Sequence, residues 1–212
     1  MKPIQKFAMH FHGLPLVAIL RGLTPQEAPA IGEALADAGF GVLEVPLNSP
    51  QPLESIEALA RTYPESLVGA GTVLTAHQVR QVHEAGGQLI VSPNFNAAVV
   101  HEAVGLGMVC LPGIATPTEA FAALEAGAHG LKLFPAEAAS PAVLKAMLAV
   151  LPAGTLMIPV GGIVPGNMAP WLAAGAHGFG LGSALYRPRK SAAAVRQDAS
   201  AFVAAFRGEL TA

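Results

Sequence analysis

Eight short, mainly apolar runs alternate with longer segments of helical character along the chain. The runs cover residues 16–20, 42–45, 67–70, 89–91, 108–111, 130–134, 156–160 and 178–181. They are apolar at nearly every position rather than at every second one, which is typical of parallel strands with both faces buried. The pattern therefore predicts an α/β fold in which each strand is followed by a helix.

Four of the helical segments end in an Ala-Gly pair. The pairs lie at 38–39, 85–86, 126–127 and 174–175, each just before an apolar run, and glycine suits the left-handed residue that follows a helix end. Gly39 and Gly175 are 136 residues apart (175 − 39). This interval covers six strand–helix units of roughly 23 residues, so eight units need about 180 residues, close to a compact barrel.

We therefore expect a single (β/α)8 TIM barrel domain over residues 1–212, with a short N-terminal lead-in at 1–13. An open, doubly wound sheet is the alternative, although no Gly-x-Gly-x-x-Gly motif follows the first run as its dinucleotide-binding form requires. Helix starts are expected at 24–25, 49–50, 75–76, 116–117, 140–141 and 164–165. In five of these pairs a Ser or Thr precedes a good first-turn residue.

The composition narrows the class of protein. Of the 212 residues 12% are charged, with 12 Lys and Arg against 14 Asp and Glu. This balance provides no basic surface for a nucleic-acid backbone. The single cysteine, Cys110, excludes an intramolecular disulfide framework and a cysteine-rich zinc site. Because so few charges cover so apolar a chain, we expect other subunits to cover part of the surface.

Two apolar stretches resemble membrane segments. The run 14–20 follows Lys2 and Lys6 but is bounded by His-x-His-Gly and Arg21, without a small-x-small cleavage pattern. No Asp, Glu, Lys or Arg occurs between Lys145 and Arg187, but Pro and Gly at short intervals would break a spanning helix there. We expect a cytoplasmic protein without a membrane segment.

One lysine interrupts an apolar run near the strand ends where such a barrel carries its active site. Lys132 lies between Leu131 and Leu133 and must point to the side opposite both. A buried ammonium is costly unless it is paired or deprotonated, and a desolvated lysine is a nucleophile that forms Schiff bases with ketones. The alternatives are a lysine that reaches solvent from the strand end and a structural ion pair.

Glu44 interrupts the second run as Lys132 interrupts its own. A carboxylate near the amine can move protons during Schiff-base chemistry, and the alternative is a structural ion pair with Lys132 or Arg21. Both interpretations require the two side chains to share the barrel interior. Arg21, which ends the first run, can bind a carboxylate or phosphate, or orient Glu44. Thr72 offers a hydroxyl at the end of the third run.

Two glycine-rich turns follow the last two runs. Gly161 and Gly162 come after the seventh run, and Gly182 and Ser183 after the eighth. Barrels of this kind often bind phosphate at these strand ends, because glycine lets backbone N–H groups approach the oxygens. Glycines that serve packing are the alternative. Arg187 is placed to assist a nearby phosphate, or it belongs to a solvated loop.

The seven histidines show no close metal-ligand spacing, so no metal site is expected. His129 and His177 occupy matching places in two Gly-Ala-His-Gly repeats, each before a strand. We interpret both as turn residues at the end of the barrel that contributes stability. Cys110 is interpreted as an inert, small apolar residue of a buried strand.

Four motifs of the chain resemble those of one family. They are EVPLNSP at 44–50, GAGTV at 69–73, KLFP at 132–135 and VGG at 160–162. Through them the chain resembles the class I aldolases of 2-keto-3-deoxy-6-phosphogluconate and 4-hydroxy-2-oxoglutarate over nearly its whole length. Within that family it is most similar to the 2-dehydro-3-deoxy-6-phosphogalactonate branch.

The resemblance implies a (β/α)8 barrel, a homotrimer, and neither a metal nor an organic cofactor. It implies that Lys132 forms a Schiff base and Glu44 moves protons while a 2-keto-3-deoxy-6-phospho sugar acid is cleaved to pyruvate and glyceraldehyde 3-phosphate. It also implies substrate contacts from Arg21, Asn48, Thr72, Pro93 and Phe134, and phosphate contacts from Gly161, Gly162, Gly182 and Ser183. Asn48 stands where gluconate-type enzymes carry an arginine, whereas FPAEA at 134–138 is closer to the gluconate type.

Several other functions fit parts of this pattern. An aldolase of the gluconate epimer or of 4-hydroxy-2-oxoglutarate would use the same chemistry. A metal-dependent aldolase would need a carboxylate and histidine ligand set, which is not evident. A phosphosugar isomerase or epimerase would use an acid–base pair without an imine. A non-catalytic sugar-phosphate-binding barrel would leave the buried lysine unexplained.

Overall fold

The computed structural model describes residues 1–210, so the last two residues of the predicted domain lie outside the described part. The strands are β1 (Leu16–Ile19), β2 (Val42–Pro46), β3 (Leu67–Gly71), β4 (Leu89–Val91), β5 (Val109–Leu111), β6 (Gly113–Ile114), β7 (Leu131–Leu133), β8 (Met157–Pro159) and β9 (Phe179–Leu181). The α-helices are α1 (Pro3–Gly13), α2 (Ala28–Asp37), α3 (Pro52–Thr62), α4 (Ala76–Glu84), α5 (Ala97–Gly105), α6 (Pro117–Glu125), α7 (Pro141–Leu148), α8 (Met168–Ala173) and α9 (Ala192–Leu210). Two short 3-10 helices are η1 (Ala136–Ala138) and η2 (Pro165–Asn167).

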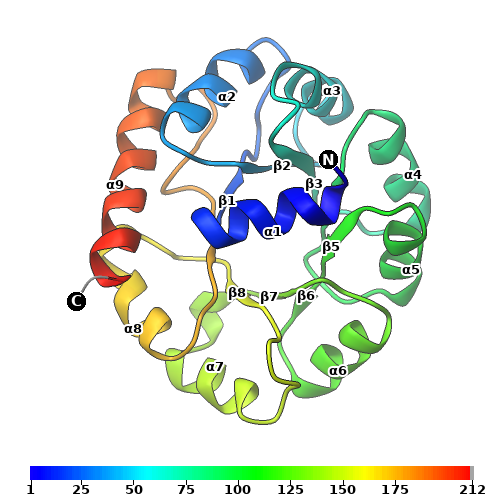
Figure 1. Ribbon diagram of the computed structural model, residues 1–212. Helices are drawn as coiled ribbons and strands as arrows, with labels where there is room; N and C mark the ends of the chain where they lie inside the picture. Colours follow the sequence, from blue (N-terminus) through cyan, green and yellow to red (C-terminus); the bar gives the residue numbers. More distant parts are fainter. Residues whose placement is uncertain (211–212) are drawn as a thin grey trace.

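The strands form two parallel sheets, surrounded by α2 to α9 (Figure 1). A curled six-stranded sheet has the order β5-β4-β3-β2-β1-β9, and a three-stranded sheet has the order β6-β7-β8. Pro112 alone separates β5 from β6. Val160, just after β8, forms a parallel bridge with Gly180 of β9. Each of the eight predicted runs contains a strand, whereas the two-residue β6 was not expected.

Successive strand residues point to opposite faces, and each face buries its own apolar cluster. Side chains on the inner face form one cluster: Val17, Ile19, Val42, Leu67, Leu89, Val91, Val109, Leu111, Ile158 and Val160. Leu43, Leu131 and Leu133 belong to the other cluster, which packs against the helices. Glu44 shares the parity of Val42, and Lys132 has the parity opposite to both leucines. The fold therefore directs the carboxyl and the amine to the same inner face.

The predicted lead-in forms a helix, α1, which crosses the middle of the molecule in front of the strands (Figure 1). Phe7 is 3% exposed and joins the inner cluster, where Leu67 and Leu89 are the first residues of their strands. The Lys6 ammonium donates hydrogen bonds to the carbonyl oxygens of Pro64 and Ser66, just before β3. Helix α1 thus covers the amino ends of the strands and leaves their carboxyl ends open.

Three of the six predicted helix starts are confirmed by their caps. Thr75, Thr116 and Ser140 each accept a hydrogen bond from the backbone N–H three residues later, while the start at 164–165 opens the 3-10 turn η2. The start at 49–50 was wrong, because the Ser49 hydroxyl accepts from the Gly22 N–H and cannot cap α3. The start at 24–25 falls on a tight turn, and the regular helix α2 begins at Ala28.

The paired histidines lie at the amino ends of two strands. The Cys110 N–H donates to Nδ1 of His129 at 3.1 Å, and the Met157 N–H donates to Nδ1 of His177 at 3.3 Å. In return the backbone N–H of each histidine donates to the carbonyl oxygen of the same strand residue. Burial raises the pKa of the Cys110 thiol to about 12, which fits the inert role expected of it. No helix within residues 1–210 is long and apolar enough to cross a membrane.

Candidate active site

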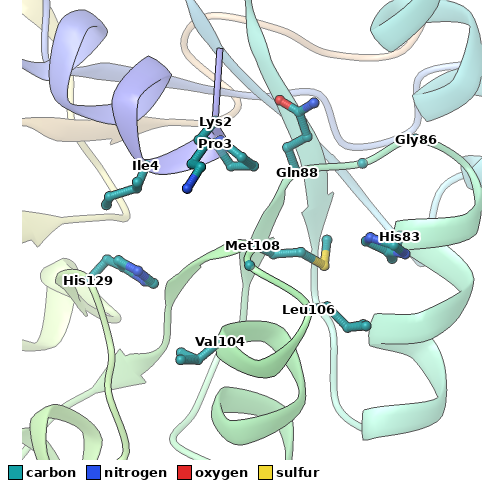
Figure 2. A pocket seen from close by; sticks show the side chains of 12 residues that line it. Lys2, Pro3, Ile4, His83, Gly86, Gln88, Val104, Leu106, Met108 and His129 are labelled. Carbon is teal, nitrogen blue, oxygen red and sulfur yellow. The ribbon is translucent and has the colours of Figure 1, made fainter.

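A cavity of about 450 Å³ opens at the carboxyl ends of the strands. Most of the predicted site residues line it: Arg21, Asn48, Lys132, Phe134, Gly161, Gly162, Gly182 and Ser183. Neither Glu44, which is buried, nor Thr72 nor Pro93 contributes to the lining surface. A larger cavity of about 600 Å³ lies at the amino ends, between α1 and the turns before β4, β5 and β7 (Figure 2), and contains none of the predicted residues.

Lys132 is held in the middle of β7, where it pairs in register with Gly113 on one side and Ile158 on the other. It is only 7% exposed, and burial lowers the pKa of its ammonium. Nζ lies 4.5 Å from the centre of the Phe134 ring and makes no hydrogen bond within the described chain. A lysine in this setting is a nucleophile whose neutral form is favoured by desolvation.

Glu44 is 1% exposed, and its Oε2 atom has no hydrogen-bond partner among the described residues. Burial raises the pKa of its carboxyl to about 7, and the charges of Lys132 and Arg21 oppose that rise. The carboxyl is therefore close enough to sense both cations, although it forms no direct ion pair with Lys132 in residues 1–210. An acid with a pKa near neutrality can both accept and return a proton.

The third strand leaves space for this carboxyl. A side chain on Gly71 would clash with the carboxylate oxygens of Glu44, so glycine is required there. The next residue, Thr72, has a φ of +56°, which is unusual for a β-branched residue and typical of functional sites. Thr72 directly follows Gly71, the last residue of β3, and lies outside the cavity lining. Gly71 is a site residue that our sequence analysis quoted only as part of the GAGTV motif.

The turns after β1 and β2 are tied together. Nη1 of Arg21 donates to Oδ1 of Asn48 at 2.6 Å, and the Gly22 N–H donates to the Ser49 hydroxyl at 2.9 Å. The Arg21 charge also lowers the pKa of Glu44. Arg21 therefore contributes to the electrostatics of Glu44 while its guanidinium faces the cavity, so the two roles considered for it are compatible.

The two glycine-rich turns lie side by side in the cavity wall. Gly161 and Gly162 have φ values of +116° and +63°. The carboxylate of Glu137 packs on this turn so closely that a side chain on Gly161 would clash with it. Glu137 was not among the predicted site residues, and neither was Tyr186, which also lines the cavity. Glu137 lies within the FPAEA segment at 134–138, which our sequence analysis noted only for its likeness to the gluconate type.

Pro93 lies at the end of β4, away from the cavity surface. Its carbonyl group packs against Gly113 closely enough to leave no space for a side chain. Since Gly113 is the register partner of Lys132, Pro93 supports the strand that carries the amine. Across residues 1–210, no group of three or more His, Cys, Asp or Glu side chains is placed to hold a metal ion.

Comparison with known proteins identifies the family of this parallel α/β fold. The chain belongs to the KDPG and KHG aldolase family, which it matches over residues 8–198. It is 52% identical to the 2-dehydro-3-deoxy-6-phosphogalactonate aldolase of Escherichia coli K12, over 92% of this chain and 95% of the relative.

Solved structures agree with this assignment. A structure described as native KDPGal superimposes with a TM-score of 0.92 and 51% identity, over 94% of this chain and 97% of the other. A KDPG aldolase from Legionella pneumophila, with pyruvate captured at low pH as a covalent carbinolamine intermediate, superimposes with a TM-score of 0.78 and 29% identity. That alignment covers 92% of this chain and 94% of the other.

Proposed function

We propose that the protein is a class I aldolase that cleaves 2-dehydro-3-deoxy-6-phosphogalactonate to pyruvate and D-glyceraldehyde 3-phosphate through a Schiff base on Lys132. The observation that carries this proposal is a buried amine and a buried carboxyl on one inner face, with the amine's pKa lowered and the carboxyl's raised to about 7. These shifts favour a neutral nucleophile and a group that exchanges protons near pH 7.

The chemistry needs only these two side chains and water. The neutral Lys132 amine attacks the C2 ketone, and loss of water from the carbinolamine gives a protonated imine. Glu44, through a water molecule, removes the proton of the C4 hydroxyl; the C3–C4 bond then breaks and its electrons flow into the imine. The aldehyde leaves, the resulting enamine is protonated at C3, and hydrolysis releases pyruvate and the free amine.

The other predicted site residues bind the substrate or shape the site in this proposal. Arg21 and Asn48 contact the sugar acid, with Thr72, Pro93 and Phe134 shaping the site around the reacting carbons. The turns at 161–162 and 182–183 bind the phosphate group. These assignments are supported by one observation: residues from five strand ends line the same cavity. This is expected for a site at the carboxyl face of parallel strands.

Adduct trapping tests the chemistry. Borohydride added with pyruvate should reduce the imine and increase the mass of the peptide that contains Lys132, because only a covalent imine is fixed in this way. The Lys132→Ala variant should show no adduct. An unmodified wild-type protein would contradict the proposal and favour an isomerase, an epimerase or a binding protein, and activity lost with a chelator would favour a metal-dependent aldolase.

The galactonate epimer is the proposed substrate because Asn48 takes the place of an arginine and the KDPGal structure is more similar than the KDPG aldolase. Coupling pyruvate release to a reporter with each C4 epimer tests this point. Faster cleavage of the galactonate epimer is expected. A clear preference for the gluconate epimer or for 4-hydroxy-2-oxoglutarate would contradict it.

We further propose that the two sheets together form a complete (β/α)8 barrel, with β5 and β6 acting as one strand kinked at Pro112. The bridge between Val160 and Gly180 would then close the ring on the other side. The pairing of the first strand, β1, with the last, β9, supports a barrel over the doubly wound alternative.

We also propose that the protein is a homotrimer. Only 12% of its residues are charged, and exposed apolar side chains such as Phe121, Val143 and Val150 project from the helical surface. Such surfaces are typical of subunit contacts. Light scattering should then give three times the chain mass of 21.6 kDa.

A further inference from the structure

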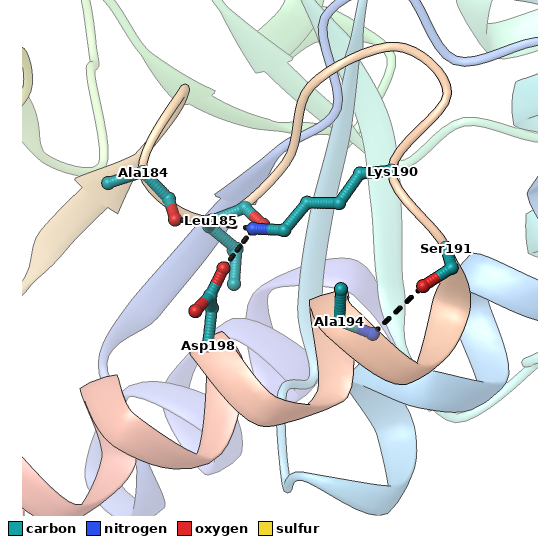
Figure 3. Close-up of polar contacts among 6 residues, drawn as sticks. All are labelled: Ala184, Leu185, Lys190, Ser191, Ala194 and Asp198. Atoms are coloured by element: carbon teal, nitrogen blue, oxygen red, sulfur yellow. Dashed lines mark hydrogen bonds and ion pairs between the residues drawn. The ribbon is translucent and has the colours of Figure 1, made fainter.

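The loop between β9 and α9 is organised around one ammonium group. Nζ of Lys190 donates hydrogen bonds to the carbonyl oxygens of Ala184 at 3.5 Å and Leu185 at 2.7 Å, and it forms an ion pair with Asp198 of α9 (Figure 3). The Lys190 side chain is only 15% exposed. Two carbonyl oxygens and a carboxylate thus converge on one partly buried cation, which connects the loop to the helix.

This loop forms one wall of the cavity. The loop residues that line the cavity are Gly182, Ser183, Ala184, Tyr186, Arg187 and Pro188. The segment is held on both sides of Arg187: the buried Tyr186 donates its backbone N–H to the Gly182 carbonyl at 3.0 Å, and Pro188 packs directly on Gly22. The Arg187 carbonyl accepts from the Lys190 N–H at 3.1 Å, whereas its guanidinium makes no hydrogen bond or ion pair within the described residues.

The substrate requires more positive charge than the rest of the cavity supplies. A phosphate monoester carries nearly two negative charges near pH 7, and the sugar acid adds its carboxylate. The charged lining residues are Arg21, Lys132, Arg187 and Glu137. Lys132 must be neutral to react, Arg21 is bonded to Asn48, and Glu137 is negative and lies against the glycine turn. Arg187 is the remaining cation.

We propose that Arg187 binds the phosphate group of the substrate and that Lys190, held by Asp198, positions the loop that presents it. This inference rests on the proposed function and adds to it a phosphate-binding cation and its positioning residue. Arg187 can donate two parallel hydrogen bonds to phosphate oxygens, which lysine cannot. Lys190 acts only through the loop, because its ammonium is already occupied by the two carbonyl groups and Asp198.

The Arg187→Gln variant tests the contact, and Arg189→Gln is its control. Arg189 is two residues further along the same loop and does not line the cavity, so both changes remove one positive charge. We expect Arg187→Gln to raise KM for the phosphorylated substrate by about ten- to hundredfold, as the loss of a charge-assisted hydrogen bond would. Turnover of the unphosphorylated sugar acid should not change. Inorganic phosphate should inhibit wild type and Arg189→Gln equally, and Arg187→Gln more weakly.

The Lys190 variants test the positioning role. Lys190→Met should raise KM for the phosphorylated substrate with little change in kcat. Lys190→Arg keeps the cation, so its KM should stay close to that of wild type. Combining Lys190→Met with Arg187→Gln should add little to Arg187→Gln alone, since both changes remove the same interaction. Arg196→Gln removes a pair with Asp37 on the exposed face of α9 and serves as the stability control. Thermal melting identifies any variant that does not fold.

The outcomes separate this inference from the proposed function. Wild-type protein that releases no pyruvate from either substrate would contradict the function itself. Wild-type protein that cleaves the phosphorylated substrate while Arg187→Gln retains its KM, or loses activity equally on both substrates, would overturn the role of Arg187. Additive losses in the double variant would overturn the positioning role of Lys190.

Discussion

Glu44 combines its proposed role in catalysis with a cost to stability. Its carboxyl is buried with an unpartnered oxygen, in a space that exists because residue 71 is glycine. A buried carboxyl destabilises the folded protein unless it stays protonated. The folded state therefore raises its pKa from 4.5 to about 7. This same shift suits a group that must gain and lose a proton in each catalytic cycle.

The Glu44→Gln variant should separate the effect of the carboxyl on stability from its effect on catalysis. Between about pH 4.5 and pH 7 the carboxyl is ionised in the unfolded chain and protonated in the folded one, so this group's contribution to stability falls as pH rises. The free energy of unfolding of Glu44→Gln, relative to wild type, should therefore rise by about 3 kcal/mol from pH 4 to pH 8.

Denaturant titrations between these pH values measure the difference in unfolding free energy between Glu44→Gln and wild type. A difference that does not change with pH would contradict the prediction. In wild type, kcat should fall below about pH 7 as the carboxyl loses its ability to accept a proton. The glutamine variant should be inactive at every pH, because its amide cannot take the place of the carboxylate.

At the scale of elements, the two Gly-Ala-His-Gly turns satisfy backbone groups of Cys110, the middle residue of β5, and of Met157, the first residue of β8. Each histidine accepts from the strand's N–H through Nδ1 and donates its own N–H to the same residue. The imidazole thus takes the place of a neighbouring strand at the sheet's amino edge. Burial lowers the pKa of both rings because desolvation disfavours the charged imidazolium. A ring protonated at Nδ1 could not accept this bond.

Substitution of His129 should reveal this bond as a dependence on pH. The contribution of this bond to stability should be complete above the pKa of histidine in the unfolded chain, about 6.5. It should decrease as pH falls below that value. His129→Ala should lose about 1 to 2 kcal/mol at pH 7.5, because the Cys110 N–H is left without an acceptor. His129→Asn keeps an acceptor that does not titrate, so it should lose less stability than wild type between pH 7 and pH 5. Equal acid sensitivity of the wild type and the asparagine variant would count against this explanation.

At the scale of the whole molecule, stability and chemistry occupy opposite ends of the strands. Helix α1 covers the amino ends and inserts Phe7 into the inner cluster. Lys132, Glu44 and the cavity that faces them lie further along the strands, toward the carboxyl ends. This separation allows loops at one end to change without loss of the core.

The Phe7→Ala variant should therefore be destabilised without losing catalysis. Removing a buried phenylalanine costs about 3 to 5 kcal/mol, and the cost appears in the free energy of unfolding measured with denaturant. The kcat of the folded fraction at 25 °C should remain that of wild type. Ile4→Ala, on the same helix but 43% exposed, is the control and should change stability little. A lower kcat for folded Phe7→Ala would show that the two ends are coupled.

The hydrophobic pattern predicted the strands well because burial on both faces leaves a continuous apolar run in the sequence. Lys132 and Glu44 were identified by the same reasoning, as polar exceptions within such runs. The helix start predicted at 49–50 was wrong: the Ser49 hydroxyl bonds to Gly22, a partner from another strand end, and α3 begins at Pro52. The two-residue β6 was missed because so short a strand has no pattern of its own.

The linear order of residues alone determined which face of each strand carries the amine and the carboxyl, because side-chain direction alternates locally along a strand. Only the tertiary structure decided what surrounds them. Three contacts illustrate this, each between residues that are distant in sequence or lie on different elements. They are the approach of Glu44 to Gly71, the packing of Glu137 on Gly161 and the ion pair of Lys190 with Asp198. Such contacts depend on how strands and helices close on one another, and no local pattern encodes that closure.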